Sequence, residues 1–306
     1  MNTELEQIVT EVGKVVKGKD EVIRKVLAAV LAGGHVLLED IPGVGKTTLA
    51  MALGKAMELE YRRMQFTPDV LPSDIVGFTM YNSGTREFEF KQGAVFCNLF
   101  LADELNRTSS KTQSALLEVM EEAKVTVDGI SHPLPKPFTV IATENPFGSS
   151  GTQLLPESQL DRFLICLSVG YPSHEAAVDI LKNSAGSGLD QVQSVMTTDR
   201  FLELRKQAET LHVSDNIYEY LVKLTEATRK HPHIALGVSP RGGIALLKMA
   251  KAMALMRGGE YVIPEDALMI IDDVWRHRIH LNARARAEGV DVSGIIVEIT
   301  ERIHAV

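Results

Sequence analysis

The sequence has little cysteine and no long apolar run, and each shortage excludes a class of protein. Only two cysteines occur in 306 residues, Cys97 and Cys166, and both fall in apolar segments that we expect to be buried strands. They predict reduced core residues of a cytoplasmic protein rather than a disulfide framework. The longest apolar stretch, 26–38, contains two glycines and a histidine and is shorter than the ~20 residues that span a bilayer. Residues 1–12 are acidic and amphipathic, so we expect neither an export signal nor a membrane span.

Clustered positive charge and grouped metal ligands are scarce as well. The formal net charge is −8, and acidic and basic side chains are interspersed. Because binding of a nucleic-acid backbone needs grouped Lys and Arg, nucleic acid is not expected as the main partner. The most basic segment, 276–288, is expected to be helical and is explained as well by a solvated face. His231 and His233 lack further ligands nearby, so no metal site is expected there.

A glycine-rich segment after an apolar strand carries the strongest functional signal. Residues 35–48 read HVLLEDIPGVGKTT, a strand that runs into a turn ending in Gly45-Lys46-Thr47. Such a turn exposes main-chain N–H groups, and the helix after it directs the positive end of its dipole at the same anion. Lys46 is expected to reach the β- and γ-phosphates of ATP, and the Thr47 hydroxyl to bind Mg²⁺. The expected nucleotide-binding residues of the turn are Pro42, Gly43, Val44, Gly45, Lys46, Thr47 and Thr48.

One position departs from the strict phosphate-binding pattern G-x-x-x-x-G-K-[ST]. Asp40 stands where that pattern has its first glycine. We expect the loop to form regardless, because Asp is one of the few other residues that tolerate left-handed or turn geometry. A glycine-rich turn without a ligand is the alternative. The guanine-binding pattern N-K-x-D is absent from the sequence, which argues against a GTPase.

A second apolar strand ends in two carboxylates. The segment 98–104 reads NLFLADE, so Asp103 and Glu104 lie at the carboxyl end of the strand, where parallel α/β sheets place ligands. Asp103 is expected to hold Mg²⁺ together with Thr47. Glu104 is expected to be the base that polarises the attacking water. Two solvated acids at a strand end would be the better explanation if the glycine-rich turn were absent.

Two polar residues follow at the ends of later segments. Asn145 closes the apolar segment 138–146, and its uncharged amide can orient a water beside the γ-phosphate, although an ordinary turn before proline is the alternative. Arg162 lies just before the next apolar strand. An arginine at such a place is expected to point at the nucleotide of a neighbouring subunit and to stabilise transition-state charge. Surface pairing with Asp161 or Glu157 is the alternative.

A third arginine occupies an electrostatically unfavourable place. Ser239 and Pro240 predict the start of a helix, and Gly258 predicts its end. Arg241 then lies in the first turn, where the helix dipole disfavours a cation by a few tenths of a kcal/mol or more. An anionic phosphate would explain its place, and a tolerated exposed arginine is the alternative.

Taken together, HVLLEDIPGVGKTT, NLFLADELNR, ATENP, QLDRF and GVSPRGG resemble the AAA+ ATPases and, within them, the MoxR family. The resemblance runs from 15–23 to 274–279, which is nearly the whole chain. It implies named roles for residues already singled out: Walker A lysine at Lys46, Walker B acids at Asp103 and Glu104, sensor 1 at Asn145, arginine finger at Arg162 and sensor 2 at Arg241. It also implies that Val16, Gly18 and Lys19 line the adenine pocket.

The same resemblance implies an activity and partners. It implies Mg²⁺-dependent ATP hydrolysis by a homo-oligomeric ring, with six subunits as the expected size. The ring would remodel, mature or activate client proteins in a chaperone-like way, with a von Willebrand factor A-type partner on another polypeptide. The alternatives are a motor subunit of a metal chelatase, a DNA-acting machine, which the acidic balance opposes, and a nucleotide-gated scaffold, which Glu104 and Arg162 oppose.

The order of apolar segments predicts an α/β fold in two domains. Residues 1–188 are expected to form an αβα core around a parallel sheet, with strands near 35–39, 61–66, 97–102, 138–143 and 164–169. Two hairpins are expected as insertions, within 81–96 and within 125–138, the second turning at Asp128-Gly129.

After a polar link at 184–198, residues 189–306 are expected to form an all-helical lid. This lid is expected to close over the nucleotide and to carry Arg241. The expected helices are 200–210, 214–230, 240–257, 264–279 and 292–304.

Overall fold

The computed structural model describes residues 1–41, 43–145, 155–182 and 188–304. Its centre is a five-stranded sheet in the order β2-β5-β8-β1-β9, and every pair in it is parallel. The strands are β1 (Val36–Glu39), β2 (Tyr61–Gln65), β5 (Leu99–Asp103), β8 (Thr139–Glu144) and β9 (Ile165–Leu167). The predicted parallel core is therefore confirmed. Because all five strands run the same way, their carboxyl ends meet at one edge of the sheet.

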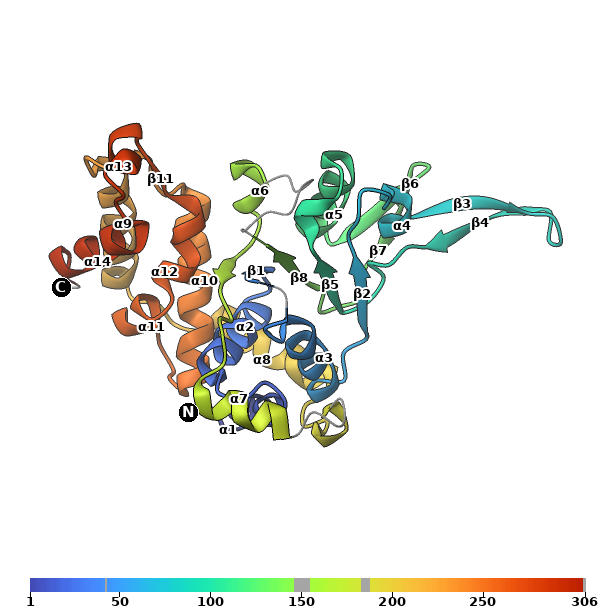
Figure 1. Cartoon of the computed structure of the whole chain (residues 1–306), viewed down its shortest axis with the longest axis horizontal. Coiled ribbons are helices and arrows are strands. Elements are labelled where there is room, and N and C mark those ends of the chain that lie inside the picture. The colour runs from blue at the N-terminus through green and yellow to red at the C-terminus, as the bar shows by residue number, and fades with distance from the viewer. Residues whose placement is uncertain (42, 146–154, 183–187, 305–306) are drawn as a thin grey trace.

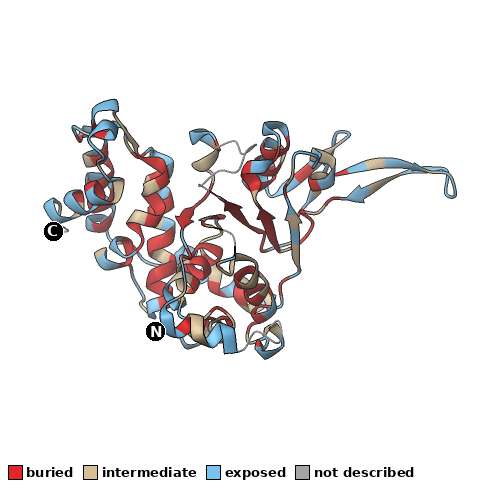
Figure 2. Cartoon of the chain, viewed as in Figure 1, coloured by how far each residue is buried: buried red, intermediate tan, exposed pale blue. Residues whose placement is uncertain are grey.

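The alternation of side chains along each strand decides which helices cover which face. Leu101 and Ile141 pack in one apolar cluster with the first three long helices. These are α1 (Thr3–Gly13), α2 (Asp20–Leu31) and α3 (Lys46–Ala56). Phe100 and Val140 point to the other face and pack against α5 (Ser110–Glu122). Strands β5 and β8 are buried along their whole length (Figure 2), as expected for central strands of a covered parallel sheet.

Both predicted hairpins are present. The first pairs β3 (Gly77–Asn82) with β4 (Glu87–Gln92), so its first arm begins before the expected range 81–96. It follows the short helix α4 (Pro72–Val76) and extends away from the rest of the molecule (Figure 1). The second pairs β6 (Lys124–Val127) with β7 (Ile130–Pro133). Asp128 and Gly129 form its turn with φ of 50° and 78°, as the sequence predicted.

The second half of the chain is mostly helical, and a strand pair in it departs from the expectation. After α6 (Glu157–Leu160) it contains α7 (His174–Lys182), α8 (Thr198–Thr210), α9 (Asp215–Lys230), α10 (Pro240–Arg257), α11 (Pro264–Leu268), α12 (Ile271–Trp275), α13 (Ala283–Ala287) and α14 (Val292–Arg302). The departure is a small antiparallel pair, β10 (Ile234–Leu236) with β11 (His280–Leu281). The expected helix 264–279 is broken into α11, α12 and the 3₁₀ turn η3 (Arg276–Arg278), because Ile270 leaves helical geometry at φ −129° and ψ 2°.

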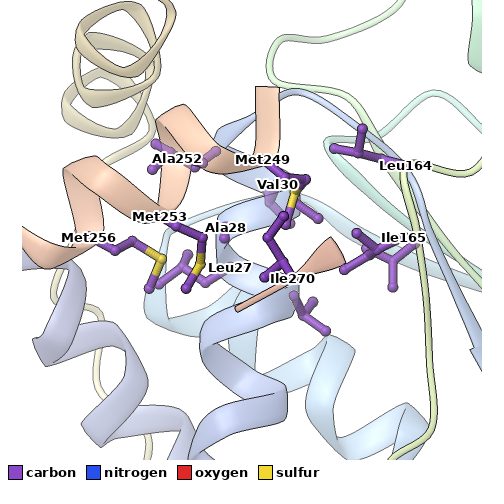
Figure 3. Packing of buried hydrophobic residues seen from close by; sticks show 14 of the residues in the cluster. Leu27, Ala28, Val30, Leu164, Ile165, Met249, Ala252, Met253, Met256 and Ile270 are labelled. Atoms are coloured by element: carbon purple, nitrogen blue, oxygen red, sulfur yellow. The ribbon is translucent and has the colours of Figure 1, made fainter. Parts of the chain in front are cut away.

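Helix α10 joins the two halves of the molecule. It begins as predicted, since the Ser239 side chain accepts a hydrogen bond from the Gly242 amide, and it ends at Gly258 with φ 80°. Met249 and Met253 lie in one apolar cluster with Leu27 and Val30 of α2 (Figure 3). This continuous packing leaves the division at residue 188 a prediction.

The predicted link 184–198 is ordered where the structure describes it. Residues 183–187 lie outside the described ranges. After the 3₁₀ turn η2 (Leu189–Gln191), the amides of Val195 and Met196 both donate to the carbonyl of Ala56, so this part of the link runs along the core. Both cysteines are buried without a disulfide, as expected. In the described ranges no helix is long and apolar enough to cross a bilayer.

Candidate nucleotide-binding site

The glycine-rich loop between β1 and α3 has the geometry of a phosphate cradle. Gly43 and Gly45 have φ of 87° and 94°, values that favour glycine, and a Cβ added to either would meet no atom within 4 Å. Both therefore border open space. Helix α3 begins at Lys46, so its first N–H groups and its positive dipole end face the same side. Pro42, which was predicted to bind the nucleotide, lies outside the described residues.

Asp40 fits the loop for a different reason from the one expected. It is not among the residues with positive φ, so the position does not need a glycine or a residue that tolerates left-handed geometry. Its buried carboxylate instead accepts hydrogen bonds from the Ser168 hydroxyl (3.1 Å) and from the main-chain amides of Val169 and Gly170. The side chain thus ties the loop to the segment that follows β9.

A cavity of about 390 Å³ opens above the loop and collects most of the predicted site residues. Its described lining consists of Gly43, Gly45, Lys46, Thr47, Thr48, Arg63, Gln65, Asp103, Glu104 and Asn145. The Lys46 ammonium donates to the main-chain carbonyl of Asp40 at 2.8 Å. Burial lowers the pKa of Lys46, and the carboxylates of Asp40, Asp103 and Glu104 oppose that shift. A cation is therefore held at the floor of the cavity.

Thr143 fixes the two acidic residues. Its hydroxyl donates to Oδ1 of Asp103 at 2.7 Å and accepts from the Glu104 amide at 2.8 Å. Glu104 has φ 55°, a conformation that costs energy for a residue with a side chain and that occurs often at functional sites. Its Oε2 atom is 2.6 Å from Nη1 of Arg107. The Glu104 carboxylate is thus paired with a cation.

Two residues of the cavity were not predicted. Arg63 places Nη2 2.6 Å from Oδ2 of Asp103, and Gln65 accepts from the same guanidinium at 3.0 Å. Both belong to β2, which pairs in register with β5, so that Gln65 lies opposite Asp103. The segment 61–65 reads YRRMQ. Polar side chains toward the carboxyl end of a strand beside β5 were the signal that could have identified them.

The chemistry of the cavity suits Mg²⁺. Thr47 and Asp103 offer a hydroxyl and a carboxylate oxygen on its wall, and hard cations prefer oxygen ligands. Within the described part of the chain no group of three or more His, Cys, Asp or Glu side chains could hold a metal alone. Mg²⁺ is usually held by one or two protein oxygens with water and substrate phosphates, so Thr47 and Asp103 would supply the protein's share of its ligands.

Arg162 and Arg241 lie together at a different place. Arg162 Nη2 is 3.4 Å from Oε2 of Glu121, and Arg241 Nη1 is 3.6 Å from Oε1 of the same carboxylate. Arg241 Nε is also 3.9 Å from Oδ2 of Asp161. Neither arginine is among the described residues that line the cavity above the loop. The first turn of α10 thus faces α5 and Asp161, and the contact of Arg241 with a nucleotide stays a prediction.

Comparison with known proteins decides the family. Residues 35–165 match the family described as "ATPase family associated with various cellular activities (AAA)", and residues 226–299 match the AAA lid domain. Over 98% of this chain and 81% of the relative, 38% of residues are identical to "Chaperone MoxR1" of Mycobacterium tuberculosis. The chain belongs to the MoxR family of AAA+ ATPases. It is also 46% identical to the protein YeaC of Bacillus subtilis over 98% of this chain and 94% of that protein.

A solved structure agrees with this MoxR-family assignment. A candidate ATPase from Cytophaga hutchinsonii superposes with a TM-score of 0.93 at 38% identity, covering 100% of this chain and 96% of that one. An MCM homologue from Methanopyrus kandleri, 19% identical with a TM-score of 0.61 over 92% of this chain and 63% of that one, shows likeness in fold alone.

Of the residues that the MoxR resemblance assigned to the adenine pocket, Lys19 contacts the segment that holds the Asp40 carboxylate. Val16 is buried, and Gly18 has φ 68°. Lys19 Nζ donates to the carbonyl of Tyr171 at 2.7 Å. Tyr171 follows Gly170, whose amide binds the Asp40 carboxylate. Lys19 is thus bound to the segment that holds the Asp40 carboxylate, and the contact of Val16, Gly18 and Lys19 with adenine stays a prediction.

Proposed function

We propose that this MoxR-family protein hydrolyses Mg²⁺-bound ATP in a homo-oligomeric ring and uses the cycle to remodel client proteins. The observation that supports it most is the cavity that brings Lys46, Thr47, Asp103, Glu104 and Asn145 together above the glycine-rich loop. The resemblance to a protein named a chaperone supports the remodelling part. A ring of six in the cytoplasm, with a separate von Willebrand factor A-type partner, is part of the same proposal.

Each side chain of the cavity has a task in this proposal. The amides of the loop and Lys46 bind the β- and γ-phosphates. Thr47 and Asp103 hold Mg²⁺, which when bound neutralises charge on the phosphate oxygens. Glu104 leaves Arg107 and accepts a proton from the attacking water, which the Asn145 side chain helps to orient.

The two remote arginines complete the site of a neighbouring subunit. Arg162 and Arg241 converge on a single carboxylate, Glu121, and their side chains are 30% and 48% exposed. Both guanidinium groups are partly exposed, so each can exchange its carboxylate partner for an anion of higher charge. A triphosphate on a second copy supplies that anion, and a guanidinium placed there stabilises the charge that develops during phosphoryl transfer.

The β3–β4 hairpin is the surface that we propose for the client. Phe78, Met80, Tyr81 and Phe88 are exposed on it, Phe88 to 76%, and the rings of Tyr81 and Phe88 are in edge contact with centroids 5.4 Å apart. Exposed apolar groups gathered on a projecting ribbon mark a protein-contact surface. A client bound to this hairpin would move together with the core, because the hairpin is attached to it.

Replacement of Glu104 by Gln tests the proposed hydrolysis. The variant should bind ATP as the wild type does, because Lys46 and the loop are unchanged, and should lose at least ~100-fold in turnover. ATP retention on filters and phosphate release measure the two quantities. Glu219→Gln, an exposed change on α9, is the matched control and should hydrolyse normally. Unchanged hydrolysis by Glu104→Gln would rule out the assigned base.

Protein concentration tests the proposed ring. Specific activity should rise with concentration until assembly is complete, because Arg162 acts on the neighbour. A monomer that is fully active at high dilution would contradict this part of the proposal.

A further inference from the structure

We propose that Asp161 and Arg278 are positioning residues, which fix the backbone around Arg162 to the lid. The position of Arg162 relative to the neighbouring subunit then depends on the orientation of the lid. The inference rests on the proposed role of Arg162 toward a neighbouring subunit. It adds the residues that orient the Arg162 side chain for this role.

Arg278 is a buried cation at the junction of lid and core. It lies in the 3₁₀ turn η3, and its side chain is only 3% exposed. Its Nε donates to Oδ1 of Asp161 at 2.7 Å. Its two terminal nitrogens donate to main-chain carbonyls of the core: Nη1 to Leu164 at 3.2 Å, and Nη2 to Asp161 at 3.2 Å and to Phe163. One planar guanidinium therefore holds the backbone on both sides of Arg162.

The Arg162 side chain is left much less constrained than its backbone. In the described part of the chain it makes an ionic contact with Glu121 at 3.4 Å, an acid that is itself about half exposed. The backbone at Asp161 and Phe163, by contrast, is fixed by charge-assisted hydrogen bonds inside the protein. A rigid base under a movable guanidinium is the arrangement needed to present that group to a site on another molecule.

The same cluster connects Arg162 to Arg241. Trp275, in α12 of the lid, donates its indole N–H to the carbonyl of Gly242, next to Arg241, at 3.1 Å. A Cβ added at Gly242 would lie 3.0 Å from Cδ of Arg278, so α10 and η3 are in close contact. Asp161 receives Arg278 on Oδ1 and faces Arg241 on Oδ2. A lid movement must therefore carry the Arg162 backbone and Arg241 together.

Asp161→Asn is the first variant to test this. It keeps the size of the side chain and removes the charge that orients Arg278 and Arg241. Because small misplacement of a reacting group costs up to about 100-fold in rate, we expect kcat to fall about 10- to 100-fold while the KM for ATP changes little. Asp190→Asn, an exposed change in η2, is the matched control and should keep both constants. A normal kcat for Asp161→Asn would overturn the proposal.

Mixed assemblies separate positioning from general damage. A subunit with a misplaced Arg162 still has an intact nucleotide cavity, so Asp161→Asn mixed with Glu104→Gln should be more active than either variant alone. Asp161→Asn mixed with Arg162→Ala should gain nothing, because both subunits lack a working guanidinium for the neighbour. Damage to the cavity of Asp161→Asn itself would give no gain in either mixture, and that result would overturn the positioning role.

A reference mixture distinguishes this inference from the function on which it rests. Arg162→Ala mixed with Glu104→Gln should regain activity if Arg162 acts on the neighbour. If the reference mixture stays inactive, the proposed function and the inference both fail. If it regains activity and the Asp161→Asn mixture does not, the inference alone fails. Arg278→Lys keeps the charge without the planar fork, and should reproduce the Asp161→Asn pattern in every mixture. If Arg278→Lys supports hydrolysis by its neighbour as well as a wild-type subunit does, that result would contradict the proposal.

Discussion

Asp40 gives the sharpest quantitative prediction, because it occupies a glycine position of the phosphate loop yet is held by specific bonds. Replacing it with Ala removes a carboxylate that receives the Ser168 hydroxyl and the amides of Val169 and Gly170. The change should destabilise the protein, although the strict motif has no side chain at this position.

The structure sets the size of the effect. The Val169 amide is buried and would lose its acceptor, which costs about 1–3 kcal/mol. Gly170 and Ser168 are more accessible, so water can replace the carboxylate and each loss costs about 0.5–1 kcal/mol. The free energy of unfolding should therefore fall by about 2–5 kcal/mol for Asp40→Ala. Asp40→Asn keeps one acceptor oxygen and should lose about half of that.

Equilibrium urea unfolding measures this loss. The slope of the transition must stay constant for the midpoints to be compared. Asp69→Ala, an exposed change in the loop after β2, is the control and should alter stability by less than about 0.5 kcal/mol. If Asp40→Ala unfolds at the same urea concentration as the wild type, the anchoring role assigned to this carboxylate is incorrect.

Two further changes test the surroundings of the site. Arg63 pairs with Oδ2 of Asp103, and a bound Mg²⁺ would compete with it for this carboxylate. Arg63→Gln should therefore lower the Mg²⁺ concentration for half-maximal hydrolysis by about two- to five-fold, as suits a half-exposed ion pair. An unchanged or higher requirement would refute the competition. Burial lowers the pKa of His35 to about 4, from 6.5 in the unfolded chain. As the pH falls, the unfolded state therefore binds the proton before the folded state does. The contribution of neutral His35 to the free energy of unfolding is complete above pH 6.5 and is lost as pH falls toward 4, by about 2 kcal/mol at pH 5. In urea unfolding His35→Gln should lack this part of the pH dependence, and an equal slope in both proteins would show that His35 does not titrate in this way.

The sequence predicted the parts of the site that depend on local patterns. A glycine-rich turn after an apolar strand located Lys46, and acids at the end of the next core strand located Asp103 and Glu104. The structure brings these side chains to one cavity because the carboxyl ends of parallel strands share one edge, and their roles stay predictions. The hairpin turn at Asp128 followed from turn chemistry in the same way.

The remaining features depend on tertiary packing, which no local pattern encodes. Arg63 binds Asp103 only because β2 pairs with β5 in that register. Arg241 lies beside Arg162 because α10 packs with its first turn toward α5, whereas its position in the helix suggested only that it meets an anion. The break in the predicted helix 264–279 sets η3 against the core, where Arg278 reaches Asp161. The sequence of 264–279 reads as one continuous helix and does not predict this break.

Hydrolysis by a mixture of two inactive variants tests the central claim most directly. Glu104→Gln keeps Arg162 but cannot activate water, and Arg162→Ala keeps the base but cannot assist its neighbour. If one active site is built from two subunits, ATP turnover should reappear when the purified variants are combined, with a maximum near equal amounts. Mixtures that stay as inactive as the separate variants, although they assemble, would contradict a site shared between subunits.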